Sequence, residues 1–368
     1  MTNETEPART PLDAMHRRLG ARMVEFAGYA MPLNYPAGIL AEHLHCRREA
    51  SLFDVSHMGQ ASLAGEGAAA ALERLVPGDI LGLRPGRQRY TLLTDERGGI
   101  LDDLMVAKLD RRLFLIVNAS RKEFDFAHIA AALPAGVNLA PHRDRALIAL
   151  QGPAAAVVLA RVAPDAARLP FLGVAEMECA GTAAVITRSG YTGEDGFEIS
   201  VAAEAAERLA TALLDQPEVR PGGLGARDSL RLEAGLCLYG ADIDTTTTPI
   251  EAGLGWTIGK RRRMAWDFPG GVVIRAQQDE GPERLRVGIR PDGRAPARAG
   301  TVLVDAAGAE IGRVTSGSFS PTLNAPLAMG YVRRKFAEDG TRLTALVRGK
   351  ALPAVVSPMP FVPHRYVR

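Results

Sequence analysis

Apolar residues recur along the chain at two different spacings, which predict helices in some segments and strands in others. In the first helix that this pattern predicts, Leu12, Met15 and Leu19 form one apolar face, Thr10 caps the start and Gly20 ends the helix. The helical spacing also predicts helices over 39–50, 68–76, 121–133 and 227–235. Alternating or continuously apolar runs predict strands over 89–94, 100–108, 113–118 and 146–150.

The chain changes character near residue 283. Before this point, hairpins of antiparallel strands are mixed with helices, which favours an α+β fold over a regular alternation of strand and helix. After it, Gly, Pro and Asp separate short β-type runs, which cover 285–289, 301–304, 311–315, 328–332 and 343–347. We therefore predict an α+β region over residues 1–280, a linker near 277–282, and a small all-β domain, barrel-like or jelly-roll-like, over residues 283–368.

Length and charge narrow the class of protein. The 368 residues exceed the ~250–300 that one core usually holds, so we expect at least two packed units. Because 44 Lys and Arg face 42 Asp and Glu, the net charge of +2 offers no broad positive field to nucleic acid. The longest uncharged stretch, 146–160, is interrupted and shorter than the ~20 residues that span a bilayer. We expect neither nucleic acid nor a membrane as a partner.

The cysteines and the N-terminal residues bear on location. Cys46, Cys179 and Cys237 are odd in number and far apart, so they predict neither a disulfide framework nor a metal-binding pair, as in a reducing compartment. The N-terminal residues are acidic and lack both the apolar segment of a signal peptide and the arginines of a transit peptide. We expect a cytoplasmic protein with no metal.

Adjacent carboxylates lie inside a strand that is otherwise apolar. In the segment 98–106, alternation puts Asp102 and Asp103 on opposite faces of the strand. One can be solvated, while the other should face a cavity, where a desolvated carboxylate is paired, raised in pKa or ready for a ligand. An acid on an edge strand that binds a turn explains the pair equally well.

Two more segments carry charged groups in unusual places. In 188–199, three glycines around Tyr191 and Glu198 predict a tight turn where backbone can approach a ligand, with a carboxylate that can accept two parallel N–H donors of a flat heterocycle. A hairpin with a surface acid is the alternative. In 222–235, Arg227 lies in a first helical turn, against the helix dipole, where it can hold a ligand carboxylate. A salt bridge to Asp228 or Glu233 is the alternative.

Taken together, these segments resemble the glycine cleavage T-protein family of aminomethyltransferases from end to end. The resemblance rests on ordered stretches at 10–12, 26–28, 51–58, 98–106, 190–200, 225–240, 315–321 and 359–363. The stretches 259–263 and 267–270 resemble the mitochondrial branch, and the missing transit peptide suggests a bacterial member of it.

This resemblance implies a reaction and a fold. An aminomethyl group on the lipoyl arm of an H-protein is handed to tetrahydrofolate, which gives 5,10-methylenetetrahydrofolate, ammonia and the dihydrolipoyl H-protein. The family fold has three domains around a central hole, so the region 1–280 should hold two interleaved α+β subdomains. No metal, nucleotide or flavin is implied.

The resemblance also assigns roles to residues. Asp103 matches the acid placed near the folate nitrogens and is the expected catalytic residue. Glu198 matches the acid that pairs with the N–H groups of the pterin. The remaining matches are expected to contact the folate or line its site: Met58, Tyr90, Asn118, Tyr191, Arg227, Trp256 and Tyr366.

Two other classes share this resemblance. Folate-binding proteins of the same fold that act in iron–sulfur cluster assembly carry Lys-Gly-Cys-Tyr-x-Gly-Gln-Glu, which the stretch 235–242 breaks. Folate modules of dimethylglycine or sarcosine oxidases are disfavoured because no flavin-binding fingerprint is present. The basic run 260–263 is either a solvated turn or, as our hypothesis, part of a surface that docks an acidic H-protein.

Overall fold

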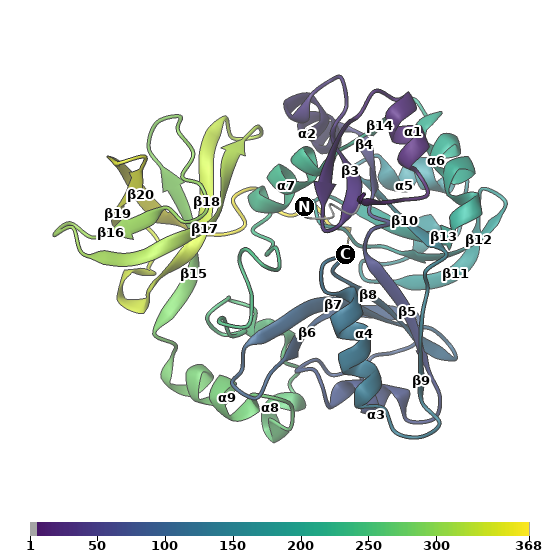
Figure 1. The fold of residues 1–368 in the computed structure, drawn as a ribbon, viewed down its shortest axis with the longest axis horizontal. Coiled ribbons are helices and arrows are strands. Elements are labelled where there is room, and N and C mark those ends of the chain that lie inside the picture. The colour runs from purple at the N-terminus through teal and green to yellow at the C-terminus, as the bar shows by residue number, and fades with distance from the viewer. Residues whose placement is uncertain (1–5, 368) are drawn as a thin grey trace.

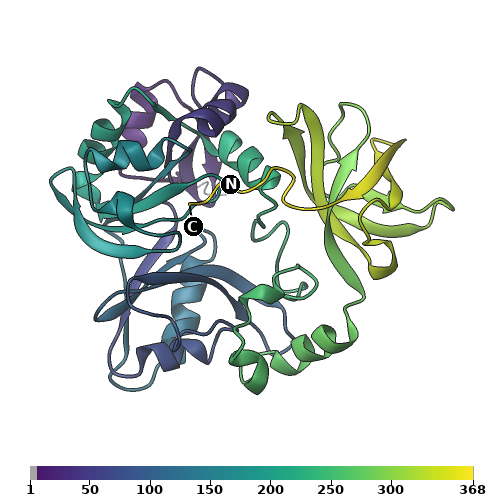
Figure 2. The same ribbon diagram turned by 180° about the vertical axis from the view of Figure 1, so that it is seen from behind.

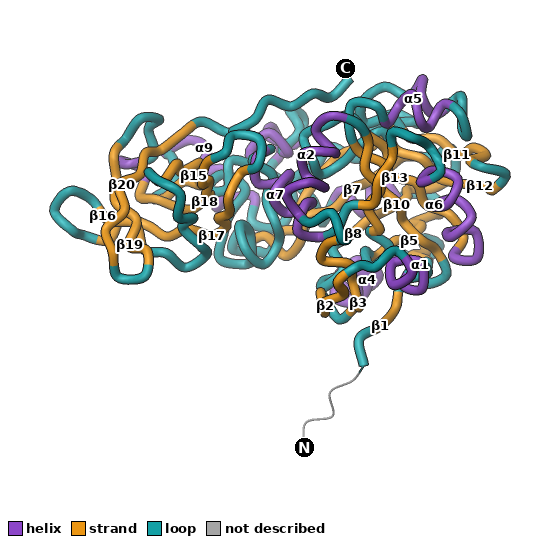
Figure 3. The backbone as a smooth tube through the Cα atoms, turned by 90° about the horizontal axis from the view of Figure 1, so that it is seen from above, coloured by secondary structure: helices purple, strands orange, loops and turns teal. Residues whose placement is uncertain are grey.

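The computed structural model describes residues 6–367. Figure 1 shows three bodies at the corners of a triangle: two are built from sheets and helices, and the third is a β-barrel. Seen from above in Figure 3, the barrel and the six-stranded sheet lie at opposite ends, with α2 and α7 between them. Within the described range, no helix combines the length and apolar character needed to cross a bilayer.

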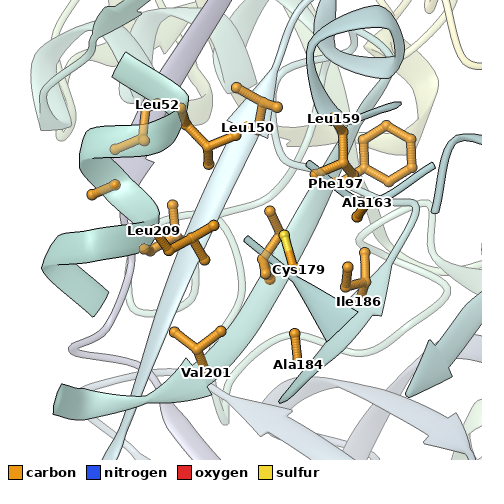
Figure 4. Packing of buried hydrophobic residues seen from close by; sticks show 14 of the residues in the cluster. Leu52, Leu150, Leu159, Ala163, Cys179, Ala184, Ile186, Phe197, Val201 and Leu209 are labelled. Atoms are coloured by element: carbon orange, nitrogen blue, oxygen red, sulfur yellow. The ribbon is translucent and has the colours of Figure 1, made fainter. Parts of the chain in front are cut away.

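The first body is centred on a six-stranded sheet. Its strands, in spatial order, are β11 (Val174–Cys179), β12 (Thr182–Thr187), β13 (Gly196–Ala202), β10 (Arg145–Gln151), β4 (Ala50–Asp54) and β14 (Val219–Pro221). Its helices are α1 (Asp13–Arg18), α2 (Ile39–Arg48), α5 (Ala155–Ala160), α6 (Ala206–Leu214) and α7 (Leu224–Glu233). A small sheet of β1 (Ala8–Arg9), β3 (Tyr29–Asn34) and β2 (Arg22–Phe26) accompanies them. In Figure 4, Leu52, Leu150 and Leu209 pack in its core, where apolar faces of the sheet and α6 meet.

The second body is inserted in the chain between β4 and β10. Its five-stranded sheet has the order β6 (Arg87–Thr94), β7 (Ile100–Lys108), β8 (Arg112–Val117), β5 (Gly59–Ala64) and β9 (Asn138–Pro141). Two helices belong to it, α3 (Ala68–Glu73) and α4 (Lys122–Ala131). Because β4 and β10 pair with each other while the whole second sheet lies between them in sequence, the two sheets are interleaved.

The third body is a closed barrel of six antiparallel strands. Around the barrel the strands are β15 (Arg284–Pro291), β18 (Ala325–Arg333), β17 (Glu310–Ser320), β16 (Val302–Val304), β19 (Arg342–Val347) and β20 (Lys350–Ser357). Pairing of β15 with β20 closes it. The connection to the barrel contains α8 (Arg262–Ala265) and α9 (Gly271–Glu280). The α+β class and the C-terminal β-barrel are thus as predicted, and the division at residues 280 and 283 stays a prediction.

Two local predictions are wrong. The Thr10 hydroxyl does not cap α1: it donates to a carboxylate oxygen of Asp54 at 2.6 Å, and the helix begins at Asp13. The predicted linker near 277–282 begins inside α9, because Ile274 is buried against Ile258 and Phe268 and gives this polar segment an apolar anchor.

The last turn of α7 fastens the barrel to the first body. Arg231 donates to Asp242 at 2.7 Å and to the Ser316 hydroxyl on β17 at 2.8 Å. Glu233 accepts from the Ser320 hydroxyl at 2.5 Å and from Arg47 at 2.7 Å. The hydroxyl groups of Ser316 and Ser320, in the stretch 315–321 that contributes to the family resemblance, therefore serve this junction.

The chain after β20 strengthens the same junction. Figure 2 shows it running from the barrel back past α7 toward the six-stranded sheet. On the way, the Val362 amide donates to the Glu233 carbonyl at 3.0 Å and the Arg365 amide to the Gly193 carbonyl at 2.8 Å. The C-terminal residues thereby return to the glycine turn of the first body.

Candidate functional site

The two adjacent aspartates lie on β7 and point to opposite faces of the five-stranded sheet. Asp102 is fully buried on the face whose next residues, Leu104 and Val106, belong to the core of the second body. Asp103 is partly exposed on the other face, which it shares with Met105. The alternation predicted from the sequence is confirmed.

Asn118, directly after β8, holds both carboxylates. Its Nδ2 atom lies 2.9 Å from an Asp102 oxygen and 2.7 Å from an Asp103 oxygen, and its backbone N–H donates to Asp102 at 3.2 Å. Because β7 and β8 are paired antiparallel strands, the residue that follows β8 comes level with these two aspartates. The structure therefore brings together two of the expected residues, Asp103 and Asn118.

The environment of Asp103 favours its protonated form. Burial, followed by the negative charge of Asp102, raises the pKa of Asp103 to about 7, and hydrogen bonding by Tyr90 and Asn118 offsets only part of this. Burial and the charge of Asp103 in turn raise the pKa of Tyr90 well above its ordinary value. A carboxyl group with such a pKa exists in both protonation states near neutral pH, which suits proton transfer.

Tyr90 links this carboxylate to an exposed aromatic residue. Tyr90 lies on β6 beside Asp103, and its ring stacks on that of Trp256 with centroids 5.6 Å apart. Trp256, in a short 3₁₀ helix (Gly255–Thr257) between α7 and α8, is 64% exposed. A large apolar ring that is both stacked and mostly open to solvent is a ready surface for another flat group.

The glycine turn supplies a buried acid on β13. Glu198 is buried and accepts a hydrogen bond from the Ser189 hydroxyl at 3.0 Å, so the alternative of a surface acid is excluded. Two of the three glycines, Gly190 and Gly196, are needed for a close approach inside the protein, and the approach of a ligand stays a prediction. A Cβ atom at Gly190 would lie 1.7 Å from Oε1 of Gln151, and one at Gly196 would lie 2.4 Å from its Nε2. The close approach is to this buried glutamine.

Arg227 has the features of a ligand-binding arginine. Its Nη1 atom is buried and has no hydrogen-bond partner among the described residues, while its guanidinium carbon lies 4.9 Å from the centre of the Tyr191 ring. Burial lowers the pKa of Arg227, against the opposing charge of Glu198. The alternative salt bridges are made by other residues, since Asp228 pairs with Arg231 and Glu233 with Arg47.

Tyr191 lies near residues from both bodies, Asp103 of the second and Arg227 of the first. Its hydroxyl donates to the Cys237 carbonyl, and the charges of Asp103 and Arg227 both act on it. Burial raises the pKa of the Cys237 thiol to about 12, so this cysteine contributes its carbonyl oxygen rather than a nucleophile.

The other two expected residues lie at the edges. Met58 packs against the cluster of apolar residues between the two sheets, as does Met105. Tyr366 stacks on Phe171 with ring centroids 4.4 Å apart, next to the glycine turn that Arg365 contacts. Sequence reasoning did not anticipate Phe171, because no pattern in its own segment distinguishes this residue. It also did not anticipate Asp125, which faces Asp102 from α4.

Two of the four basic residues in the run 260–263 are held in ion pairs. Arg262 is buried and pairs with Asp267, while Arg261 pairs with Glu73 and Asp79. These two arginines tie α8 to the second body, whereas Lys260 and Arg263 are exposed, so the docking hypothesis for the run stays a prediction. Within residues 6–367, no group of three or more His, Cys, Asp or Glu is placed to hold a metal ion.

Comparisons with known proteins agree with this geometry. Residues 12–262 match the family model of the GCVT N-terminal domain, and residues 284–363 match that of the glycine cleavage T-protein C-terminal barrel domain. The chain is 50% identical to the mitochondrial aminomethyltransferase of Gallus gallus, over 97% of this chain and 93% of the relative. It is 49% identical to that of Homo sapiens, over 97% and 91%.

A solved structure has the same fold. The crystal structure of glycine cleavage system aminomethyltransferase T from Bartonella henselae matches with a TM-score of 0.92 and 44% identity. The match covers 98% of this chain and 99% of that one.

Proposed function

The chain belongs to the glycine cleavage T-protein family and is an aminomethyltransferase of the glycine cleavage system, and on this premise we propose its donor, its acceptor and its catalytic residue. The donor is the aminomethyl group on the lipoyl arm of an H-protein, and the acceptor is tetrahydrofolate. The products are 5,10-methylenetetrahydrofolate, ammonia and the dihydrolipoyl H-protein. The observation that carries the proposal is the Asp103 carboxylate, with its pKa near 7, which acts on the same Tyr191 as Arg227, whose buried Nη1 atom has no hydrogen-bond partner among the described residues.

The polar groups around Tyr191 fit a folate. Glu198 offers buried acceptor oxygens that suit the N–H groups of a pterin, and Arg227 offers a buried donor without a partner among residues 6–367. A flat ring that carries both kinds of atom can donate N–H groups to Glu198 while its acceptor atoms receive the hydrogen bond from Arg227. Tyr90 and Trp256 add the stacking surface for it.

Asp103 manages the proton of the transfer. Tetrahydrofolate supplies the nitrogen nucleophile that accepts the one-carbon unit. Two bonds from folate nitrogens to the carbon form as its bonds to the lipoyl sulfur and to the amine break, and the two protons that the folate nitrogens lose end on the sulfur and on the departing ammonia. In its ionised form, Asp103 accepts one of these protons, and a pKa near the working pH lets the carboxyl group pass it on to a leaving group. Asn118 and Tyr90 hold the carboxylate in position, so its orientation is set before the substrates bind.

The expected contacts at the edges complete the binding site. In this proposal Met58 lies against the bound ligand from the first body, and Tyr366 contacts it from the C-terminal residues. The protein works in the cytoplasm of a bacterium, and its three cysteines, all buried and free of disulfide bonds, support a reducing compartment.

The test is an assay with lipoylated H-protein that carries the aminomethyl group, tetrahydrofolate and the purified chain, with release of ammonia as the readout. We expect Asp103→Ala to slow turnover by about 10²–10⁴-fold, because general acid–base catalysis contributes that much. Calorimetric titration should show folate binding largely retained. The matched control is Asp110→Ala, an exposed aspartate in the turn of the same hairpin. Turnover by Asp103→Ala close to that of the control would overturn the assigned role.

A further inference from the structure

Behind the catalytic carboxylate lies a third aspartate to which the family resemblance assigns no role. Asp125 is in the first turn of α4 and fully buried, and neither of its carboxyl oxygens has a hydrogen-bond partner among the described residues. Asp102 is the side chain that acts on it most strongly, and two carboxylates that face each other have no donor between them unless one carries a proton. A buried carboxylate without any donor is very costly, so this group needs a proton or a ligand.

The surroundings of Asp125 offer little positive charge. Arg121 acts on it from the turn before α4, but the Arg121 Nε–H donates to the Leu101 carbonyl at 3.1 Å. From β7, Asp102 and Asp103 both act as negative charges, and Tyr239 contributes a phenol from the loop after α7. Two facing carboxylates in such a place share a proton, because they cannot both ionise at neutral pH.

The hydrogen bonds decide which of the two carries that proton. Asp102 accepts two hydrogen bonds from Asn118, through its backbone N–H and its side-chain amide, and these favour an ionised Asp102. Asp125 accepts none within the described range. Burial and the Asp102 carboxylate raise the pKa of Asp125 to about 10, in agreement with a protonated Asp125.

We propose that Asp125 is a positioning residue: a neutral carboxylic acid whose O–H donates to Asp102 and thereby fixes the Asn118 amide that holds Asp103. The chain of contacts runs from α4 through β7 to the residue after β8, and from there to the other face of the sheet. Asp125 touches no substrate and acts only through Asp102 and Asn118. This inference rests on the proposed catalytic role of Asp103.

Two substitutions separate this role from simple packing. Asp125→Asn keeps the shape and a donor, so it should reproduce the neutral acid and keep kcat within about threefold. Asp125→Leu removes the donor. Asp102 then takes up a proton more readily and releases the Asn118 amide, so kcat should fall by about tenfold to a hundredfold as Asp103 loses its orientation.

The pH profile adds a readout that packing alone would not move. Protonation of Asp102 in Asp125→Leu removes a negative charge beside Asp103, which lowers the pKa of Asp103. The acid limb of kcat/KM should therefore shift to lower pH in this variant and stay in place in Asp125→Asn. Equal losses in the two variants, or a Leu variant with unchanged kcat and profile, would overturn the proposal.

Carboxyl ¹³C NMR of the substrate-free protein tests the protonation itself. The Asp125 resonance, assigned by its loss in Asp125→Asn, should stay at the protonated position between about pH 5 and pH 8, where an ordinary aspartate is ionised. An ionised Asp125 in this range would overturn the inference, even if Asp125→Leu does not fold. Because the measurement needs no turnover, it is independent of whether Asp103→Ala abolishes activity, which tests the proposed function alone.

Discussion

Replacing Asp103 with asparagine should make the protein more stable while it removes activity, and the gain in stability should depend on pH. The structure holds this carboxyl group where its ionised form is disfavoured by burial and by Asp102. The substituted amide would keep the shape of the side chain and could still accept from Asn118, but it would never carry the charge. The difference in free energy of unfolding between the two proteins therefore measures the cost of an ionised Asp103 in the folded state.

The size of the effect follows from the pKa. Folding raises the pKa of Asp103 from 3.8 to about 7. Each pKa unit corresponds to about 1.36 kcal/mol, so ionised Asp103 destabilises the folded state by about 4 kcal/mol. Because the folded state binds the proton more tightly, the contribution of Asp103 to stability falls as the pH rises from about 4 to about 7 and changes no further above this range. The advantage of Asp103→Asn should grow over the same interval.

Urea unfolding of both proteins at a series of pH values measures this difference. We expect midpoints that lie close together near pH 4 and separate as the pH rises, with a plateau above about pH 7. The Asp110→Asn variant, in the exposed turn of the same hairpin, is the control, and its midpoint should follow the wild type throughout. A constant offset between Asp103→Asn and the wild type across the range would refute the reasoning.

Two further predictions concern the residues around Tyr191. Arg227→Met should raise the KM for tetrahydrofolate by about tenfold to a hundredfold, since a hydrogen bond from a charged group contributes about 1.5–3 kcal/mol, and it should raise the melting temperature by removing a buried unpaired donor. Steady-state kinetics and thermal unfolding check both effects, and an unchanged KM would remove Arg227 from the site. Gly190→Ala should lower the free energy of unfolding by about 1–3 kcal/mol, because its Cβ overlaps the buried Gln151 side chain. A urea midpoint equal to that of the wild type would show that the glutamine moves aside freely.

Local patterns allowed part of this structure to be predicted. The period of two along β7 placed Asp102 and Asp103 on opposite faces, because alternation depends only on neighbouring residues. Thr10 looked like a cap for the same local reason, yet its hydroxyl is taken by Asp54, 44 residues away. Contacts of this kind depend on the tertiary fold and leave no trace in the segment itself.

Asp125 is the clearest case of what sequence reasoning cannot reach. An aspartate in the first turn of a helix is favoured by the helix dipole and looks like an ordinary exposed residue. Only the packing of α4 on the sheet places it against Asp102. The residues of the proposed site that were anticipated came from the family resemblance, which covers the chain as a whole and so includes such long-range contacts.

Helix α7 carries a residue of the proposed site at one end and contacts the barrel at the other, so it connects the barrel to the site. Arg227 lies in its first turn, while Arg231 and Glu233 at the other end hold β17 of the barrel. Ten helical residues span only about 15 Å and behave as a stiff rod, so a small tilt imposed by the barrel is passed to the guanidinium. Substitutions on the barrel face that contacts α7 can thus change affinity for the one-carbon acceptor, although the barrel strands carry none of the proposed ligand contacts.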